Sequence, residues 1–314
     1  MKKLNWKFLI TCIFLIIIFS IIIWFIVGFF KQKNEKDNAY IYQMNVAFDD
    51  GNYEKMKKIA KGRNLNKVYL SKTIECDQSD EDEIYFDRAC LTPLEMVSSN
   101  QTDNVTEILQ FLLDNGAKID FIDPMSGQSA LFYAVEALNI KTVDFLIKKG
   151  ASLNITISGN KTPIEHLTRQ YIPKSKEYND KREKKFQIFK LLLENNDNQK
   201  NNQEFLENLL LLSIENNSDD IGKYLIENYN VNINKIYTKE NNRTLLIISV
   251  IEGNIKMVKT LLDNNADKSI KDIDGKTALD YAKDLHSYKS EYYLTRWSWN
   301  SYFIREKITY SKLG

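Results

Sequence analysis

Short runs of hydrophobic residues recur along most of the chain with the three-to-four-residue spacing of one helix face. In the clearest run, Ile255, Val258 and Leu261 would lie on one side of a helix. Comparable runs occupy 108–113 and 143–147. Each run follows another short apolar segment and precedes a turn rich in Asn or Gly. This arrangement predicts a series of two-helix hairpins, and therefore an all-α fold.

The first helix of each hairpin begins with a recurring triplet. The six triplets are Thr92-Pro93-Leu94, Ser129-Ala130-Leu131, Thr162-Pro163-Ile164, Asn208-Leu209-Leu210, Thr244-Leu245-Leu246 and Thr277-Ala278-Leu279. Thr, Ser and Asn are favoured helix N-caps, and a proline suits the first helical position because its missing N–H is not needed there. The residues five places after each N-cap are mostly small, as close helix contact requires. They are Val97, Ala134, Leu167, Ser213, Ser249 and Ala282.

The second helices end in turns that tolerate a left-handed backbone. These turns are Asn115-Gly116-Ala117, Gly150-Ala151 and Asn264-Asn265-Ala266. The segment 272–277 is the clearest copy of the turn that leads into the next hairpin.

The order of triplet, small residue, second helix and turn resembles the ankyrin repeat, whose period is about 33 residues and whose signature is T-P-L-H-x-A. The resemblance extends from about residue 39 to 284 and implies a helical-hairpin solenoid, because a hairpin of this kind buries its apolar face only by stacking. The signature His is replaced by Glu95, Phe132, Glu165, Leu211, Ile247 and Asp280, which puts that hydrogen-bonding network in doubt.

The repeats at 89–284 are flanked and interrupted by atypical segments. Residues 39–88 are expected to form a degenerate N-terminal capping repeat followed by an acidic loop, and 285–314 an aromatic C-terminal cap with no recognisable second helix. The third repeat is longer than the family period, and the excess lies in a charged insertion near 169–185. Insertions in such proteins map to loops or helix extensions, often on the binding side.

Residues 8–30 form an uncharged, strongly apolar run. As a helix the run would be roughly 35 Å long, enough to cross a hydrocarbon core of about 30 Å. A cleaved signal peptide is the alternative, but its apolar region is shorter and ends at a small-x-small site. We therefore expect a short basic tail at 1–7, one transmembrane helix at 8–30 that acts as a signal-anchor, and a linker at 31–38.

The orientation of this anchor is set only weakly by its flanking charges. A short basic tail normally stays in the cytoplasm, which would place the C-terminal part outside. Cys76 and Cys90 would then close a disulfide loop worth about 3 kcal/mol; two free thiols in a cytosolic domain are the alternative. Sequons such as Asn160-Lys161-Thr162 lie where glycans would obstruct the stack, so a periplasm fits better than a eukaryotic lumen. We expect a single-pass protein of a bacterial inner membrane.

Candidate chemistry is scarce. The formal net charge of +1 provides no field for nucleic acid, and the chain has only two histidines and three cysteines. Phosphate-binding glycine motifs, HExxH and CxxC do not occur, so no cofactor, metal site or small-molecule substrate is expected. His166 is interpreted as a packed histidine rather than a base, and the acidic loop at 77–83 as a solvated charge run.

The resemblance implies a protein that binds another protein along turn tips and first helices and carries out no catalysis. The matched variable positions are Met125, Ser126, Gln128, Glu136, Ala137, Ile251, Glu252, Ile273, Asp274 and Lys276. A scaffold or a sequestering inhibitor, including immunity against a secreted toxin, is the leading hypothesis. A structural factor that organises envelope or membrane proteins is the second, and an enzyme with an unrecognised site is the third.

Overall fold

The computed structural model describes residues 40, 43–44, 46–47, 51–66, 91–124, 126–156, 161–173, 175–287 and 289–295. The predicted anchor at 8–30, Cys76, Cys90 and the acidic loop lie outside these residues. No helix within the described ranges is both long enough and apolar enough to cross a membrane. The anchor, its orientation and the disulfide therefore stay predictions.

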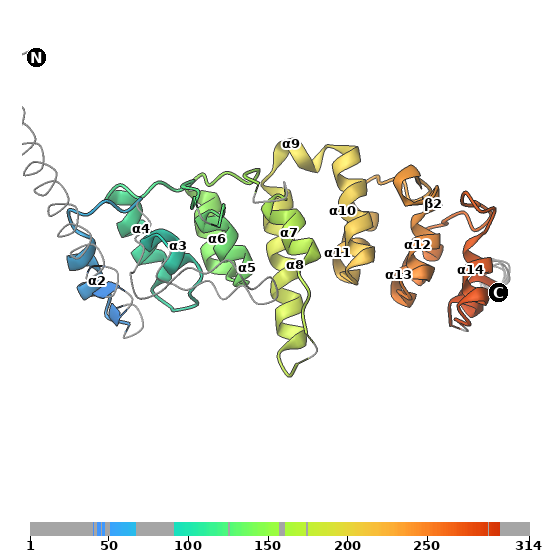
Figure 1. The fold of residues 1–314 in the computed structure, drawn as a ribbon, viewed down its shortest axis with the longest axis horizontal. Helices are drawn as coiled ribbons and strands as arrows, with labels where there is room; N and C mark the ends of the chain where they lie inside the picture. The colour runs from blue at the N-terminus through green and yellow to red at the C-terminus, as the bar shows by residue number, and fades with distance from the viewer. Residues whose placement is uncertain are drawn as a thin grey trace, which may run out of the picture. The chain divides into compact units, whose positions relative to one another are not determined.

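The chain divides into two compact units, Met1–Ala130 and Leu131–Gly314. In the first unit, α3 (Pro93–Ser98) and α4 (Val105–Asp114) form a helical hairpin, and α2 (Tyr53–Ala60) packs against α4 (Figure 1). Asn66 connects these elements because its side-chain amide donates to the carbonyl of Gly116 at 2.8 Å and accepts from the amide of Lys118.

The second unit consists of two layers of helices. Its elements are α5 (Ala130–Glu136), α6 (Ile140–Lys148), α7 (Pro163–Arg169), α8 (Tyr178–Glu194), α9 (Asp197–Lys200), α10 (Gln203–Glu215), α11 (Asp219–Asn228), β1 (Ile236–Tyr237), η2 (Thr238–Glu240), β2 (Arg243–Thr244), α12 (Leu245–Ile251), α13 (Ile255–Asp263) and α14 (Ala278–Asp284). The first helices α7, α10, α12 and α14 pack in one row, and the second helices α6, α8, α11 and α13 in the other (Figure 1). The short strands pair antiparallel, with Ile236 opposite Thr244.

The first helices begin where the triplets predict in five of the six cases. Thr92, Thr162 and Thr277 each form a reciprocal capping box with the acidic residue three places on, and Thr244 accepts from the amide of Ile247. These bonds satisfy amide groups that would otherwise lack a partner at the helix start.

One predicted helix start is wrong, and one lacks its capping bond. Asn208 lies inside α10, whose N-cap is Asn202; the Asn202 side chain accepts from the amide of Phe205 at 3.1 Å, so the helix begins more than a turn earlier. Ser129 directly precedes α5, as its triplet predicts, but its hydroxyl is buried without a hydrogen-bond partner and makes no capping bond.

The core of the repeats is centred on the residues predicted to be small. Val97, Ala134, Leu167, Ser213, Ser249 and Ala282 are all 0% exposed. Their position beneath the neighbouring helices explains why the sequence has mostly small side chains there.

Left-handed residues follow both helices of two repeats, α5–α6 and α12–α13, and one helix of three others. Gly116, Gly150 and Asn265 follow the second helices with φ of 96°, 86° and 65°, as predicted. The first helices α5, α10, α12 and α14 are followed by one such residue each: Leu138, Asn217, Gly253 and His286. In each case the amide of the next residue donates to the carbonyl of the small buried residue of that first helix, for example Asn254 to Ser249 at 2.9 Å.

The insertion appears between α7 and α8 and as extra turns at the start of α8, which is 17 residues long. Figure 1 shows α8 extending past the other helices of its row. At the C-terminal end, residues 289–295 are helical and Leu294 is 3% exposed, so a short second helix does follow α14, contrary to the prediction.

Candidate binding surfaces

The last described turn tip, 270–277, is organised by the buried carboxylate of Asp272. Its oxygens accept from the amides of Asp274 and Lys276 at 3.0 and 2.9 Å, and from the hydroxyl of Tyr281 at 2.6 Å. Burial opposes ionisation of this carboxyl group, but these hydrogen bonds, together with the charge of Arg243, lower its pKa below the ordinary value. The tip therefore has one well-defined backbone conformation.

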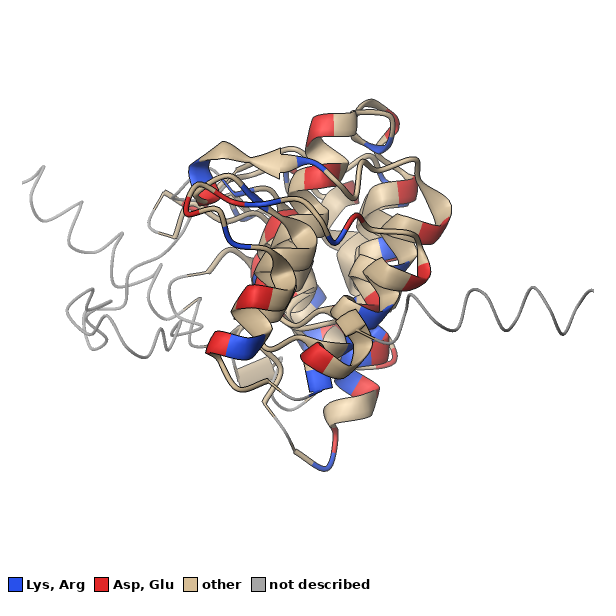
Figure 2. Cartoon of the chain, turned by 90° about the vertical axis from the view of Figure 1, so that its right-hand side faces the viewer, with Lys and Arg blue, Asp and Glu red and all other residues tan. Residues whose placement is uncertain are grey.

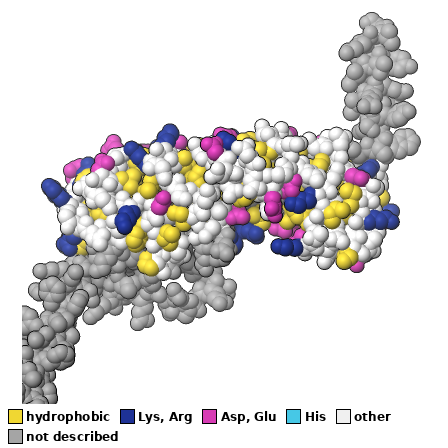
Figure 3. All heavy atoms as spheres, turned by 90° about the horizontal axis from the view of Figure 1, so that it is seen from above, with side chains coloured by type: hydrophobic (Ala, Val, Ile, Leu, Met, Phe, Trp, Pro, Cys, Tyr) yellow, Lys and Arg dark blue, Asp and Glu magenta, His cyan; other side chains and the backbone are white. Residues whose placement is uncertain are grey.

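Backbone bonding also joins this tip to the preceding one. The amide of Ile273 donates to the carbonyl of Asn241 at 3.1 Å. The Ile273 side chain is nevertheless 67% exposed, and Ile236 on the preceding tip is 48% exposed. Two hydrophobic side chains are thus presented to solvent on a fixed backbone. The view in Figure 3 shows hydrophobic side chains among charged ones on the surface of the described residues.

Two other predicted residues lie on this tip. Asp274 is exposed, whereas the Lys276 ammonium donates to Asp284 at 2.8 Å and lies 5.4 Å from the centre of the Tyr281 ring. A bound protein would meet Lys276 already tied to the first helix of its own repeat.

The predicted residues at the end of two first helices are accessible to different degrees. Glu136 and Glu252 are exposed, and Ala137 and Ile251 are half-buried. The carbonyl of Glu136 also accepts from the side-chain amide of Gln170 at 2.9 Å, which ties α5 to the C-terminal end of α7.

The tip at 122–129 differs from the prediction in one residue. The Ser126 hydroxyl donates to Asp123 at 2.8 Å and also accepts from the amide of Gln128 at 3.1 Å, so Ser126 shapes the turn. Gln128 is only 6% exposed, because the turn packs its side chain inward, and it cannot contact a partner in this conformation. Met125 lies outside the described residues.

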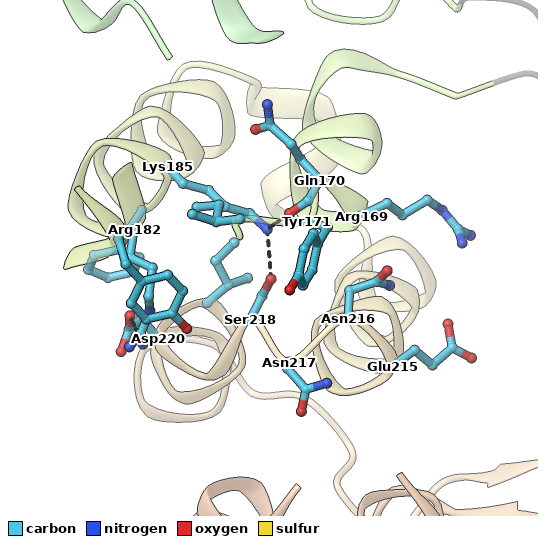
Figure 4. A pocket seen from close by; sticks show the side chains of 14 residues that line it. Arg169, Gln170, Tyr171, Arg182, Lys185, Glu215, Asn216, Asn217, Ser218 and Asp220 are labelled. Atoms are coloured by element: carbon cyan, nitrogen blue, oxygen red, sulfur yellow. Dashed lines mark hydrogen bonds and ion pairs between the residues drawn. The ribbon is translucent and has the colours of Figure 1, made fainter. Parts of the chain in front are cut away.

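A cavity of about 220 Å³ lies beside the insertion, entirely within the second unit. Its wall includes Tyr171 and Arg182 from the inserted residues and Ser218 and Asp220 from the start of α11 (Figure 4). Arg182 and Asp220 form an ion pair at its edge. Tyr171 is 77% exposed.

Lys185 reaches into this cavity from α8 and closes the C-terminal end of α7. Its ammonium donates to the carbonyls of Thr168 and Gln170 at 3.1 and 2.8 Å and to the Ser218 hydroxyl at 2.8 Å. A cation at this place is favourable because the helix C-terminus presents unpaired carbonyls and a partial negative charge. Burial, reinforced by the charge of Arg182, lowers the pKa of Lys185 to about 8.

His166, the histidine considered as a catalytic base, has an environment typical of a structural residue. His166 packs edge-on against Phe132, with ring centroids 5.6 Å apart, and burial lowers its pKa, as do the charges of Lys161 and Lys185. This confirms its interpretation as a packed histidine. No group of three or more His, Cys, Asp or Glu side chains that could hold a metal ion occurs among the residues described. Charged residues of both signs are distributed over the helices (Figure 2).

The family model for ankyrin repeats (three copies) matches residues 44–167 and 181–272, well over half of the chain. The chain belongs to the ankyrin-repeat family. The family model leaves out residues 168–180, which overlap the charged insertion near 169–185.

Solved ankyrin structures share the fold. An ankyrin repeat domain from Acinetobacter baumannii is 22% identical, with a TM-score of 0.50, and the match covers 66% of this chain and 97% of that one. The ankyrin repeat domain of Bcl-3, a member of the IkappaB protein family, is 18% identical with a TM-score of 0.52, over 76% of this chain and 92% of that one.

Two curated relatives match parts of the chain. A putative ankyrin repeat protein of Borreliella burgdorferi is 35% identical over 69 residues, 22% of this chain and 31% of the relative. Alpha-latrotoxin-Lg1a of Latrodectus geometricus is 27% identical over 178 residues, 56% of this chain and 12% of the toxin. The aligned parts are therefore less than a third of each relative's length.

Sequence reasoning missed three features of these surfaces. Ile236 lies outside the recurring triplets, and the role of Lys185 depends on contacts with residues far from it in the sequence. Tyr171 could have been found, since it occupies the position that follows a first helix and carries a left-handed residue in other ankyrin repeats of this chain.

Proposed function

We propose that the chain is a membrane-tethered protein-interaction module that binds another protein along its turn tips and first helices and catalyses no reaction. The observation that carries the proposal is the exposure of Ile236 and Ile273 on adjacent tips whose backbones are hydrogen-bonded together. Apolar side chains held in this way bind with little loss of conformational entropy. Ankyrin repeats generally bind proteins, which supports the same conclusion.

The tether rests on the apolar run at 8–30. Together with the flanking charges, it supports a single-pass protein of a bacterial inner membrane whose repeats face the periplasm. Within that setting the repeats would act as a scaffold or as a sequestering inhibitor, for example one that protects the cell from a secreted toxin. A factor that organises envelope proteins is the alternative, and it is favoured by the anchor itself.

Crosslinking in intact cells tests the binding proposal. The wild-type full-length chain and two variants, Ile273→Asp and Lys259→Asp, would be purified from crosslinked membranes. Ile273 is at a tip, whereas Lys259 is exposed on the second helix α13. We expect a protein partner that is retained by Lys259→Asp and reduced at least tenfold by Ile273→Asp. Recovery of no partner, or equal loss in both variants, would count against the proposal.

Two further measurements separate the finer alternatives. Thiol labelling of Cys76 and Cys90 in intact and lysed cells reports which side of the membrane they occupy and whether they are bridged. Removal of residues 1–30, with export by another signal, should leave an inhibitor partly active but abolish the action of a membrane organiser.

A further inference from the structure

The third ankyrin repeat of the chain ends its first helix differently from its neighbours. After α5, α10, α12 and α14, a left-handed residue turns the chain directly towards the second helix. Between α7 and α8, residues 170–177 take the place of this turn, and the Lys185 ammonium donates hydrogen bonds to the carbonyls of Thr168 and Gln170. The detour leaves a cavity of about 220 Å³ where the repeats of α5, α10, α12 and α14 have a tight turn.

The Lys185 ammonium in this cavity has no negatively charged partner among the described residues. Asp220 is paired with Arg182. Lys185 donates only to uncharged oxygens, and no carboxylate forms an ion pair with it in the described part of the chain. Figure 4 shows Arg169 and Glu215 pointing away from the Lys185 ammonium. A buried cation without an anionic partner attracts an incoming carboxylate by charge. Because the three N–H groups of Lys185 already donate, the carboxylate would replace the Ser218 hydroxyl as one of the three acceptors.

The mouth of the cavity carries an exposed aromatic side chain. Tyr171 is 77% exposed, points into the same space as Lys185, and has Phe186 and Tyr178 as further lining residues. Tyrosine is enriched among the residues that dominate protein interfaces, because it has much contact area and few rotatable bonds. Tyr171 would pack against the chain that bears the carboxylate.

We propose that this cavity binds an acidic side chain of the partner protein, with the carboxylate directed to Lys185 and the adjoining partner backbone packed on Tyr171. The proposal rests on the proposed function, since it adds a second contact region to the one at the turn tips. It gives the charged insertion a role in selecting partners that have an acidic residue at the matching place.

The test uses two short peptides that differ only in charge, Gly-Gly-Glu-Glu-Gly-Gly and its Gln-Gln counterpart, with saturation-transfer NMR on the full-length protein. We expect signal for the Glu peptide and severalfold less for the Gln peptide. The Lys185→Met and Tyr171→Ala variants should reduce the Glu-peptide signal severalfold. Lys184→Met is the matched control, since Lys184 is adjacent, carries the same charge and is paired with Asp180. Equal loss in Lys184→Met, or equal signals for the two peptides, would overturn the proposal.

The partner recovered by crosslinking separates this proposal from the proposed function. Because Lys185 also closes α7, Tyr171→Ala decides the outcome if Lys185→Met fails to fold. We expect Tyr171→Ala to weaken partner binding about tenfold without changing the melting temperature. A partner whose binding depends on Ile273 but not on Tyr171 would overturn the cavity proposal and leave the function intact.

Discussion

Tyr281 donates a 2.6 Å hydrogen bond to the buried carboxylate of Asp272, and this bond ties a turn tip to the first helix of the same repeat. Replacement of Asp272 by Ala removes the acceptor for Tyr281 and for two backbone amides. We expect a loss of about 2 kcal/mol in the free energy of unfolding, because these donors are left without partners. Urea unfolding followed by circular dichroism measures it. Asp274→Ala, at an exposed position of the same tip, should change stability by less than about 0.5 kcal/mol; a similar loss in both variants would contradict the role of Asp272.

The second helix α13 depends on its N-cap. The Asn254 side chain accepts from the amide of Met257 at 3.1 Å, and Asn254 is 4% exposed. Asn254→Ala should therefore lower the free energy of unfolding by about 1 kcal/mol. The exposed Lys259 on the same helix provides the control variant Lys259→Ala, which should be nearly neutral. Thermal melts that place Asn254→Ala at or above the wild type would refute this.

Stability at neutral pH should be limited by Glu95. Burial raises the pKa of Glu95 from 4.5 to about 7, despite the opposing hydrogen bonds from Thr92. The folded chain then holds more protons than the unfolded chain between pH 4.5 and 7, so stability is present at low pH and is lost as the pH rises through 7. The slope contributed by this one group is at most about 1.4 kcal/mol per pH unit.

Glu95→Gln isolates this effect. The difference in free energy of unfolding between the variant and the wild type should grow in favour of Glu95→Gln from pH 5 to pH 8. Glu165→Gln, in the equivalent capping box but only half-buried, provides the comparison. A difference that does not depend on pH would show that Glu95 is not the group responsible.

Lys185 should contribute in the alkaline range. Its pKa falls from 10.5 to about 8 on folding, so between these values the unfolded chain binds more protons and stability rises with pH. Lys185→Met should lower stability at pH 7, since the carbonyls at the end of α7 lose their donor. It should also remove a rise of up to about 1.4 kcal/mol per pH unit between pH 8 and 10. Chemical unfolding of Lys185→Met and Lys184→Met across this range checks both points; parallel curves would contradict the prediction.

The repeat architecture could be predicted because its signals are local. A small buried residue such as Ser249 lies at a fixed distance from the N-cap of its own helix. A left-handed residue such as Gly150 likewise lies directly after its own helix. The prediction at Asn208 was wrong for the same reason, since Asn-Leu-Leu resembles a capped helix start. An earlier N-cap at Asn202 instead extends α10 by more than a turn.

The cavity could not be predicted because it depends on contacts between distant positions. Lys185 and Ser218 are far apart in the sequence, and their 2.8 Å hydrogen bond forms only once two repeats have packed. The burial of Gln128 was also missed, although it depends only on residues nearby in the sequence. Its place in a turn suggested exposure, but the fold of that turn around Asp123 buries it.

The amide of Ile273 that bonds to Asn241 has a consequence for how the end of the stack opens. Because donor and acceptor lie in successive repeats, that amide proton can exchange with solvent only when the two repeats come apart. Its exchange rate in heavy water would therefore report the cooperativity between the last repeats directly. A bound partner that spans both tips should slow this exchange even if it never touches the amide itself.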